Sequence, residues 1–209
     1  MQKLYNSGVL SNDNPVALQR KVYFETSLHF ARRGREGIRQ LKKSSFEIKT
    51  DDQGKRYVTI NYNEKSKKDK GDDKNAIIKE SRIYEQLDDS QCPVRSFELY
   101  LSKLSDKGED LFQQPKANNT HSEWYTGRPQ GINTIGNFMP DISKAAGLSK
   151  VYTNHCLRAT AVTVLANSGV DATDIIAVSG HKNVQSILPY RSNVSDSKRY
   201  AMSNVLASF

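Results

Sequence analysis

The last third of the chain carries a tyrosine, two histidines and an arginine whose types and spacing suit phosphodiester cleavage. His155 and Arg158 stand three residues apart, so on a helix both side chains can face one phosphate. His181 follows Arg158 by 23 residues, and Tyr190 follows His181 by nine. The phenol of Tyr190 can attack phosphorus while the cationic side chains neutralise the phosphorane-like transition state. The four residues therefore predict a nucleophilic site for a phosphodiester.

This chemistry needs positive charge, because a free tyrosine has a pKa near ~10 and only about one phenol in a thousand is ionised at pH 7. Two arginines can hold the non-bridging phosphate oxygens by paired, charge-assisted hydrogen bonds, a task that a divalent metal performs in many nucleases. Arg158 is one of them, and Arg32, Arg33 or Arg35 supplies the other. The sequence shows no carboxylate cluster spaced for magnesium, so we expect neither a metal nor another cofactor.

The remaining tasks are proton transfers. His155 suits the proton acceptor and His181 a second phosphate donor. A lysine from the segment 65–70 (KSKKDK) can protonate the leaving 5′-oxygen. Taken singly, each of these residues also fits ordinary structure: a surface tyrosine, a histidine beside a helix end, a capping pair, a solvated lysine loop. Their joint spacing favours the catalytic interpretation.

Charge points to a polyanionic partner. The 209 residues hold 31 lysines and arginines against 23 acidic residues, a formal net charge of +8. The positive charge is clustered, because segment 31–43 has six basic residues and one acidic, and segment 65–70 has four lysines. Beyond the catalytic candidates, we expect DNA contacts from Arg32, Arg35, Arg39, Lys65, Lys68, Lys70 and Lys182.

Compartment signals are few. Cys92 and Cys156 share no metal-ligand spacing and form no disulfide framework, which favours a reducing compartment. The sequence has no run of 18 apolar residues and no signal-peptide pattern after Met1. The cytosol and the nucleus are both reducing compartments; for a protein that acts on DNA we expect the nucleus, and no membrane association.

The elements that position these residues can be predicted from local signals. Segment 14–30 has helical spacing, with Asn14 as N-cap and Pro15 at the first position. A glycine-containing turn at 33–35 ends it, and 36–43 follows as a short helix. SFEIKT and KRYVTINYN alternate apolar and polar residues around DDQG, which predicts a hairpin, and a third strand is expected around 76–79.

The second half is predicted to be helical after a loop-rich stretch. Pro93 opens a helix over 93–104, and residues 105–133 are loops anchored by LFQQP and Trp124. Gly147 and Gly169 suit helix C-terminal caps, and Asp171 suits an N-cap. Helices are expected at 134–146, 155–168, 172–179 and 183–188. The fold class is therefore α+β, mainly α, with a small antiparallel three-stranded sheet.

Longer stretches of the chain resemble a known family. They are LSNDNPVALQRKVYFETSLHFARRGREG, INYNEKSKK, CPVRSFELYLSKL, YTNHCLRATAVTVL and SGHKNVQSILPY. They resemble the catalytic domain of tyrosine recombinases of the phage-integrase type, and within that family the Crypton DNA transposons and the Crypton-derived domains of eukaryotic regulatory proteins. The resemblance covers almost the whole chain and is most specific in YTNHCLRAT and GHK-x7-Y. It implies the helical integrase catalytic-domain fold with its three-stranded sheet.

The resemblance also implies roles. Tyr190 matches the nucleophile, Arg158 the second family arginine, and His155 and His181 the two histidines. The first arginine matches Arg33, with Arg35 as the alternative, because the glycine turn leaves the register open. The hairpin lysine matches Lys67, with Lys68 as the alternative.

The implied domain plan is a catalytic domain over 1–190 and a C-terminal tail over 191–209, without the N-terminal core-binding domain with which such recombinases clamp DNA. A tail helix over Ser197–Leu206 is expected, which packs either on its own domain or on a neighbouring subunit. Its apolar positions are Tyr200, Met202, Val205, Leu206 and Phe209. Dimers or tetramers on double-stranded DNA are implied.

We therefore expect an enzyme of DNA recombination, integration or transposition that cuts and rejoins strands through a covalent 3′-phosphotyrosyl intermediate. The main alternative is a domesticated, catalytically silent module that binds DNA or protein. A third possibility, relaxation of supercoils as in type IB topoisomerases, shares the chemistry and differs in assembly.

Overall fold

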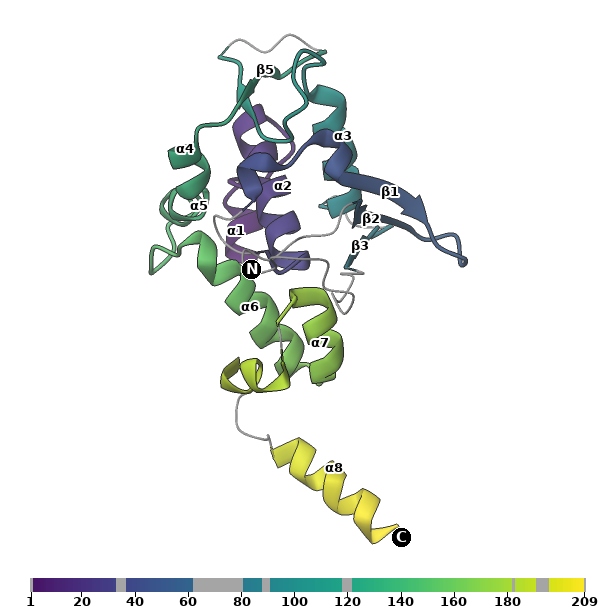
Figure 1. The fold of residues 1–209 in the computed structure, drawn as a ribbon. Coiled ribbons are helices and arrows are strands. Elements are labelled where there is room, and N and C mark those ends of the chain that lie inside the picture. Colours follow the sequence, from purple (N-terminus) through teal and green to yellow (C-terminus); the bar gives the residue numbers. More distant parts are fainter. Residues whose placement is uncertain are drawn as a thin grey trace.

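The computed structural model of the chain is mainly helical, with two small antiparallel sheets (Figure 1). It describes residues 2–32, 37–61, 81–87, 91–117, 122–181, 183–190 and 196–208. The α-helices are α1 (Gln2–Asn6), α2 (Pro15–His29), α3 (Pro93–Lys103), α4 (Ile132–Gly136), α5 (Phe138–Ala145), α6 (Asn154–Asn167), α7 (Ala172–Ser179) and α8 (Asp196–Ala207). The 3-10 turns are η1 (Ile38–Gln40), η2 (Lys43–Ser45), η3 (Val184–Ser186) and η4 (Leu188–Tyr190). The strands are β1 (Phe46–Thr50), β2 (Arg56–Ile60), β3 (Arg82–Tyr84), β4 (Gln113–Pro115) and β5 (Tyr125–Pro129).

Helix α2 is the central element of the body and contacts α3, α5 and α6. The Oδ1 atom of Asn14 accepts a hydrogen bond from Ala17 N at 2.9 Å, which satisfies a donor of the first turn. Pro15 stands at the first helical position, where no N–H is needed. The predicted start of this helix is therefore confirmed, and most of its side chains are buried.

The predicted hairpin is also confirmed. Strands β1 and β2 pair antiparallel, with Ile48 opposite Val58, and β3 pairs with β2, with Val58 opposite Ile83. The third strand thus lies at 82–84, whereas the stretch 76–79 predicted for it is outside the described residues. The three-stranded antiparallel sheet and the predominance of helix confirm the predicted fold class.

The continuous short helix predicted for 36–43 is wrong, because η1 and η2 stand there with an extended stretch between them. The cause is pairing with a distant segment. Lys43 N donates to Glu109 O and Leu111 N donates to Leu41 O, both at 2.8 Å. These bonds use backbone groups that a helix would need for itself.

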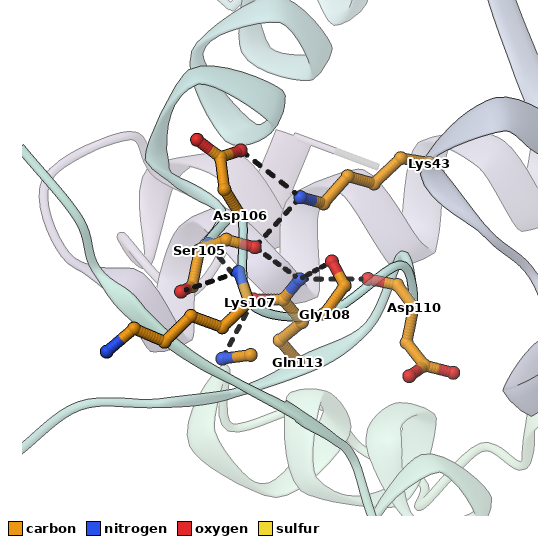
Figure 2. A network of polar contacts seen from close by, with 8 residues as sticks. Lys43, Ser105, Asp106, Lys107, Gly108, Asp110 and Gln113 are labelled. Atoms are coloured by element: carbon orange, nitrogen blue, oxygen red, sulfur yellow. Dashed lines mark hydrogen bonds and ion pairs between the residues drawn. The ribbon is translucent and has the colours of Figure 1, made fainter.

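A second sheet, β4–β5, lies within the stretch predicted as loops. The buried side-chain amide of Gln113 joins the loop before β4 to strand β5, as Figure 2 shows for the loop contacts. Gln113 Nε2 lies 3.2 Å from the carbonyl oxygens of Ser105, Gly108 and Asp110, and its Oε1 accepts from the backbone N–H groups of Ser105 and Gly127 at 3.1 Å. The predicted anchor Trp124 packs against the main core.

The helix predicted over 134–146 is divided into α4 and α5 at Asn137. The buried side chain of Asn154 provides partners at the break: its Nδ2 donates to Ile135 O at 2.7 Å and its Oδ1 accepts from Met139 N at 2.9 Å. A tertiary contact thus replaces helical hydrogen bonds, and it joins the start of α6 to this corner.

The C-terminal elements follow their local signals more closely. Asp171 accepts from Thr173 N at 3.0 Å as the cap of α7, whose bounds match the prediction. Gly147 and Gly169 have φ of +58° and +86°, as expected for residues that follow helix ends. The predicted helix at 183–188 forms as η3 and η4 instead.

The described residues form two hydrophobic cores, and α6 belongs to both. The main core surrounds α2 and includes Leu157 from the first half of α6. A smaller core consists of Val162, Ala166, Ile175, Ile176 and Ile187, with Tyr190 packed against it. Figure 1 shows α6 running from the body to α7, with α8 beyond. No helix among the described residues is long and apolar enough to span a bilayer.

Candidate functional site

Arg158 lies on α6 one turn after His155 and reaches back to the end of α2. Its guanidinium is buried, with the residue 8 % exposed, and Nη1 donates to Ala31 O at 3.0 Å. Ala31 has φ +43°, a conformation that costs a non-glycine residue free energy and persists when surrounding contacts hold it. Arg158 therefore supports the backbone turn at Ala31, which is two residues before Arg33 in the sequence. His155, by contrast, is exposed to solvent.

The basic cluster after α2 is divided between buried and exposed positions. Arg32, expected to contact DNA, is only 4 % exposed. Its guanidinium lies beside Gly37, where an added Cβ atom would be 3.7 Å from Nη2. Arg39, on η1, is exposed and available to a partner. Arg33 and Arg35 lie outside the described residues, so the choice of first arginine stays a prediction.

His181 and Tyr190 lie beside each other, and Tyr190 packs against the smaller core. Gly180, with φ +66°, ends α7 in the left-handed conformation, and His181 follows it. The His181 Nδ1 atom is 2.6 Å from Ser179 Oγ, and the ring centroids of His181 and Tyr190 are 6.0 Å apart at an interplanar angle of 59°. Tyr190 is half-buried and ends η4, which packs on α6.

The other candidate nucleophiles can be compared with Tyr190. Among the ten tyrosines of the chain, Tyr23, Tyr100 and Tyr125 are fully buried in the main core. Burial raises the pKa of each of these phenols above its ordinary value, which keeps them protonated. The phenol of Tyr190 stands at the edge of the smaller core beside an imidazole, a setting better suited to attack on a bound phosphate.

Ser81, the residue that follows the lysine-rich segment, contacts α7. Residues 62–80 lie outside the described residues, and with them Lys65, Lys67, Lys68 and Lys70; Lys182 does so too. The end of this segment is fixed at buried Ser81, whose Oγ donates to Val178 O at 3.2 Å. Thr59 Oγ1 donates to Ser81 O at 3.2 Å, so Ser81 connects strand β2 to α7. Val178 precedes His181 by three residues, so Ser81 contacts the last turn of α7, which His181 follows.

Of the described candidates, the structure brings His181 and Tyr190 together, and it places Arg158 on α6 in contact with Ala31 after α2. Within the described part of the chain, no group of three or more His, Cys, Asp or Glu side chains could hold a metal ion. Sequence reasoning did not single out Ala31, Ser81 or Ser179. Only Ser179 had a local signal, because it stands next to the Gly180–His181 pair.

Comparisons with known proteins give a family and, from the solved structures, a fold. The family model described as a domain of unknown function (DUF3504) matches residues 1–144, which end before α6. A sequence comparison with curated proteins finds no match. Among solved structures, XerA recombinase aligns with a TM-score of 0.54 at 18% identity, covering 97% of this chain and 59% of that one.

Two further structures are complexes with DNA. The Tn1549 transposon integrase with a circular intermediate DNA aligns with a TM-score of 0.58 at 15% identity, covering 97% of this chain and 63% of that one. A lambda integrase dimer bound to a COC′ core site aligns with a TM-score of 0.51 at 14% identity, covering 93% and 58%. This chain therefore spans less than two thirds of the length of these structures.

At such identities, the likeness shows the fold and leaves the residues of the site untested. The fold is that of the tyrosine recombinase catalytic domain, as the resemblance of the sequence implied. The match over 1–144 covers more than half of the chain. The chain belongs to the family of the domain of unknown function DUF3504 and has the tyrosine recombinase catalytic-domain fold.

Proposed function

We propose that this domain cuts and rejoins DNA strands, with Tyr190 as the nucleophile and a covalent 3′-phosphotyrosyl intermediate. The observation that carries the proposal is the pairing of His181 with Tyr190, at a ring-centroid distance of 6.0 Å. Arg158 adds to it, because it donates a hydrogen bond to Ala31 O, immediately before the arginine-rich segment of the sequence. The fold shared with recombinases and integrases supports the same chemistry.

In the proposed reaction, the Tyr190 Oη atom attacks phosphorus and the bond to the 5′-oxygen breaks. His155 accepts the phenol proton, and Lys67 or Lys68 gives a proton to the departing oxygen. Arg158, the first arginine (Arg33 or Arg35) and His181 donate hydrogen bonds to the phosphate oxygens. Attack by a 5′-hydroxyl on the phosphotyrosine reverses these steps and reseals the strand, so no ATP is consumed.

The partner in this proposal is double-stranded DNA, and several copies of the protein act together on it. Arg39 and the lysines of 65–70 supply the electrostatic attraction to phosphates. On the resemblance of YTNHCLRAT and GHK-x7-Y, we assign the domain to the Crypton group and expect it to act in the nucleus. Residues 1–190 are the catalytic domain in this scheme, and 191–209 are the tail.

The test is covalent trapping on a nicked suicide duplex that carries candidate element-end sequence. The unsubstituted protein should form an SDS-resistant adduct, and Tyr190→Phe should bind the duplex equally well and form none, because only the attacking oxygen is removed. Tyr200→Phe, at an exposed position of α8, is the matched control and should keep the adduct. An adduct that persists in Tyr190→Phe would refute the assignment. Binding by all three proteins without any adduct would favour a silent binding module.

A further inference from the structure

We infer that Ser179 is a positioning residue for His181: its hydroxyl donates a hydrogen bond to Nδ1 and holds the imidazole in the tautomer with the proton on Nε2. The Oγ–Nδ1 distance of 2.6 Å carries the inference. The consequence for catalysis rests on the function proposed above, since it concerns the phosphate that His181 would contact.

Local backbone geometry explains how the two side chains meet. Ser179 is the last residue of α7, and Gly180 has φ +66°, which turns the chain so that His181 comes back toward the helix end. Gly180 N donates to Ile176 O at 2.7 Å, which fixes this turn. A residue with a Cβ adopts such a φ only at a cost. Gly180 therefore contributes to the Ser179–His181 contact through its backbone conformation.

The direction of the hydrogen bond follows from burial. Ser179 is 0 % exposed, and within the described part of the chain its hydroxyl has one partner, His181 Nδ1. If Nδ1–H donated to the hydroxyl, the O–H of Ser179 would be buried without an acceptor among these residues, which is unfavourable. If the hydroxyl donates, both groups are satisfied. The Nδ1 atom is then an acceptor, and the ring proton is on Nε2.

This assignment gives His181 a defined role. With the proton on Nε2, a neutral imidazole donates through the nitrogen remote from Ser179, so it can bind a phosphate oxygen without first being protonated. The Tyr190 ring also lies beside the imidazole, at 6.0 Å between centroids. Ser179 and Tyr190 together restrict the orientation of the ring, which reduces the reorganisation needed when DNA binds.

The first test is nitrogen-15 NMR of the histidine rings in the free protein, which has four histidines. His181→Ala identifies the His181 signals. We expect the ring proton on Nε2 and an Nδ1 shift typical of a hydrogen-bond acceptor. Ser179→Ala should move the Nδ1 signal, while Ser186→Ala, whose hydroxyl donates to Asn183 Oδ1 at 2.8 Å, should not. A proton on Nδ1 in the unsubstituted protein would overturn the inference, even if Ser179→Ala fails to fold. So would an unchanged His181 spectrum in a folded Ser179→Ala.

The second test is a double-mutant cycle on cleavage of the suicide duplex. Ser179→Ala should slow adduct formation roughly three- to tenfold, the equivalent of one neutral hydrogen bond, with DNA affinity unchanged. In a His181→Ala background the same change should have no further effect, because Ser179 acts through the imidazole. Additive losses would contradict the inference. If the protein forms no adduct at all, the proposed function fails, and the NMR result still decides the role of Ser179.

Discussion

At the scale of single residues, Arg158 joins two parts of the candidate site. Its three-residue spacing from His155 could be read in the sequence, and it predicted a shared helix face. Its bond to Ala31 O could not, because the two residues are 127 positions apart and the contact depends on how α6 crosses α2. The arginine therefore has a structural partner in the free protein in addition to its proposed role on phosphate.

Arg158→Ala should lower both cleavage and stability. Removing one preorganised donor to the developing oxyanion costs about 10²–10³ in rate. Loss of the donor to the buried Ala31 carbonyl should lower the free energy of unfolding by about 1–3 kcal/mol. Single-turnover trapping and urea unfolding measure the two effects. Arg39→Ala, at an exposed position, is the control and should mainly weaken DNA binding. Equal and modest losses in both variants would show that the arginines only attract DNA.

Cleavage should not require a divalent metal, because arginines and histidines supply the positive charge at the phosphate. We expect adduct formation on the suicide duplex to be the same with EDTA as with Mg²⁺. The rate is followed by denaturing gel over time. Loss of the adduct in EDTA and its return with Mg²⁺ would overturn the proposed mechanism.

At the scale of elements, the sequence predicted correctly those helix starts that are set by residues within one turn. Asn14 with Pro15, Pro93, and Asp171 predicted the starts of α2, α3 and α7, because caps and prolines act within one turn. The break at Asn137, the 3-10 turns η1 and η2 and the sheet β4–β5 were missed. Each depends on a partner distant in sequence, such as Asn154, Glu109 or Gln113. Their sequence patterns alone carry no sign of that partner.

The smaller core should stabilise the segment that carries His181 and Tyr190 independently of the main core. Ile175→Ala removes a fully buried side chain from it, which should cost about 2–5 kcal/mol in local stability. Hydrogen exchange should then increase in 172–190 much more than in α2. Ile142→Ala makes the same change in the main core and should increase exchange in α2 as well. Identical exchange patterns in the two variants would show a single cooperative unit.

At the scale of the whole molecule, the tail helix was predicted from its apolar spacing, and α8 forms over Asp196–Ala207. Its described apolar side chains are exposed, with Tyr200 at 69 % and Leu206 at 75 %, and Figure 1 shows it apart from the body. Whether the tail packs on its own domain or on a neighbouring subunit stays a prediction. An exposed apolar helix at a terminus favours contact with another surface.

Truncation after Asn193 should leave the melting temperature of the domain unchanged, because α8 buries little apolar surface in the isolated chain. Assembly of several copies on a DNA duplex should be impaired if the tail binds a neighbour. Thermal unfolding and native gel shifts measure the two outcomes. A lower melting temperature or loss of solubility in the truncated monomer would show that the tail packs on its own domain.

The central claim is that Tyr190 becomes covalently joined to DNA. The most direct measurement is mass spectrometry of tryptic peptides from the trapped adduct after nuclease digestion. Trypsin separates the candidates, because Tyr190 falls in the peptide 183–191 and Tyr200 in 200–209. We predict a nucleotide remnant on the phenol oxygen of Tyr190. A remnant on Tyr200 or on any other residue, or none on a duplex that the protein binds, would contradict this assignment.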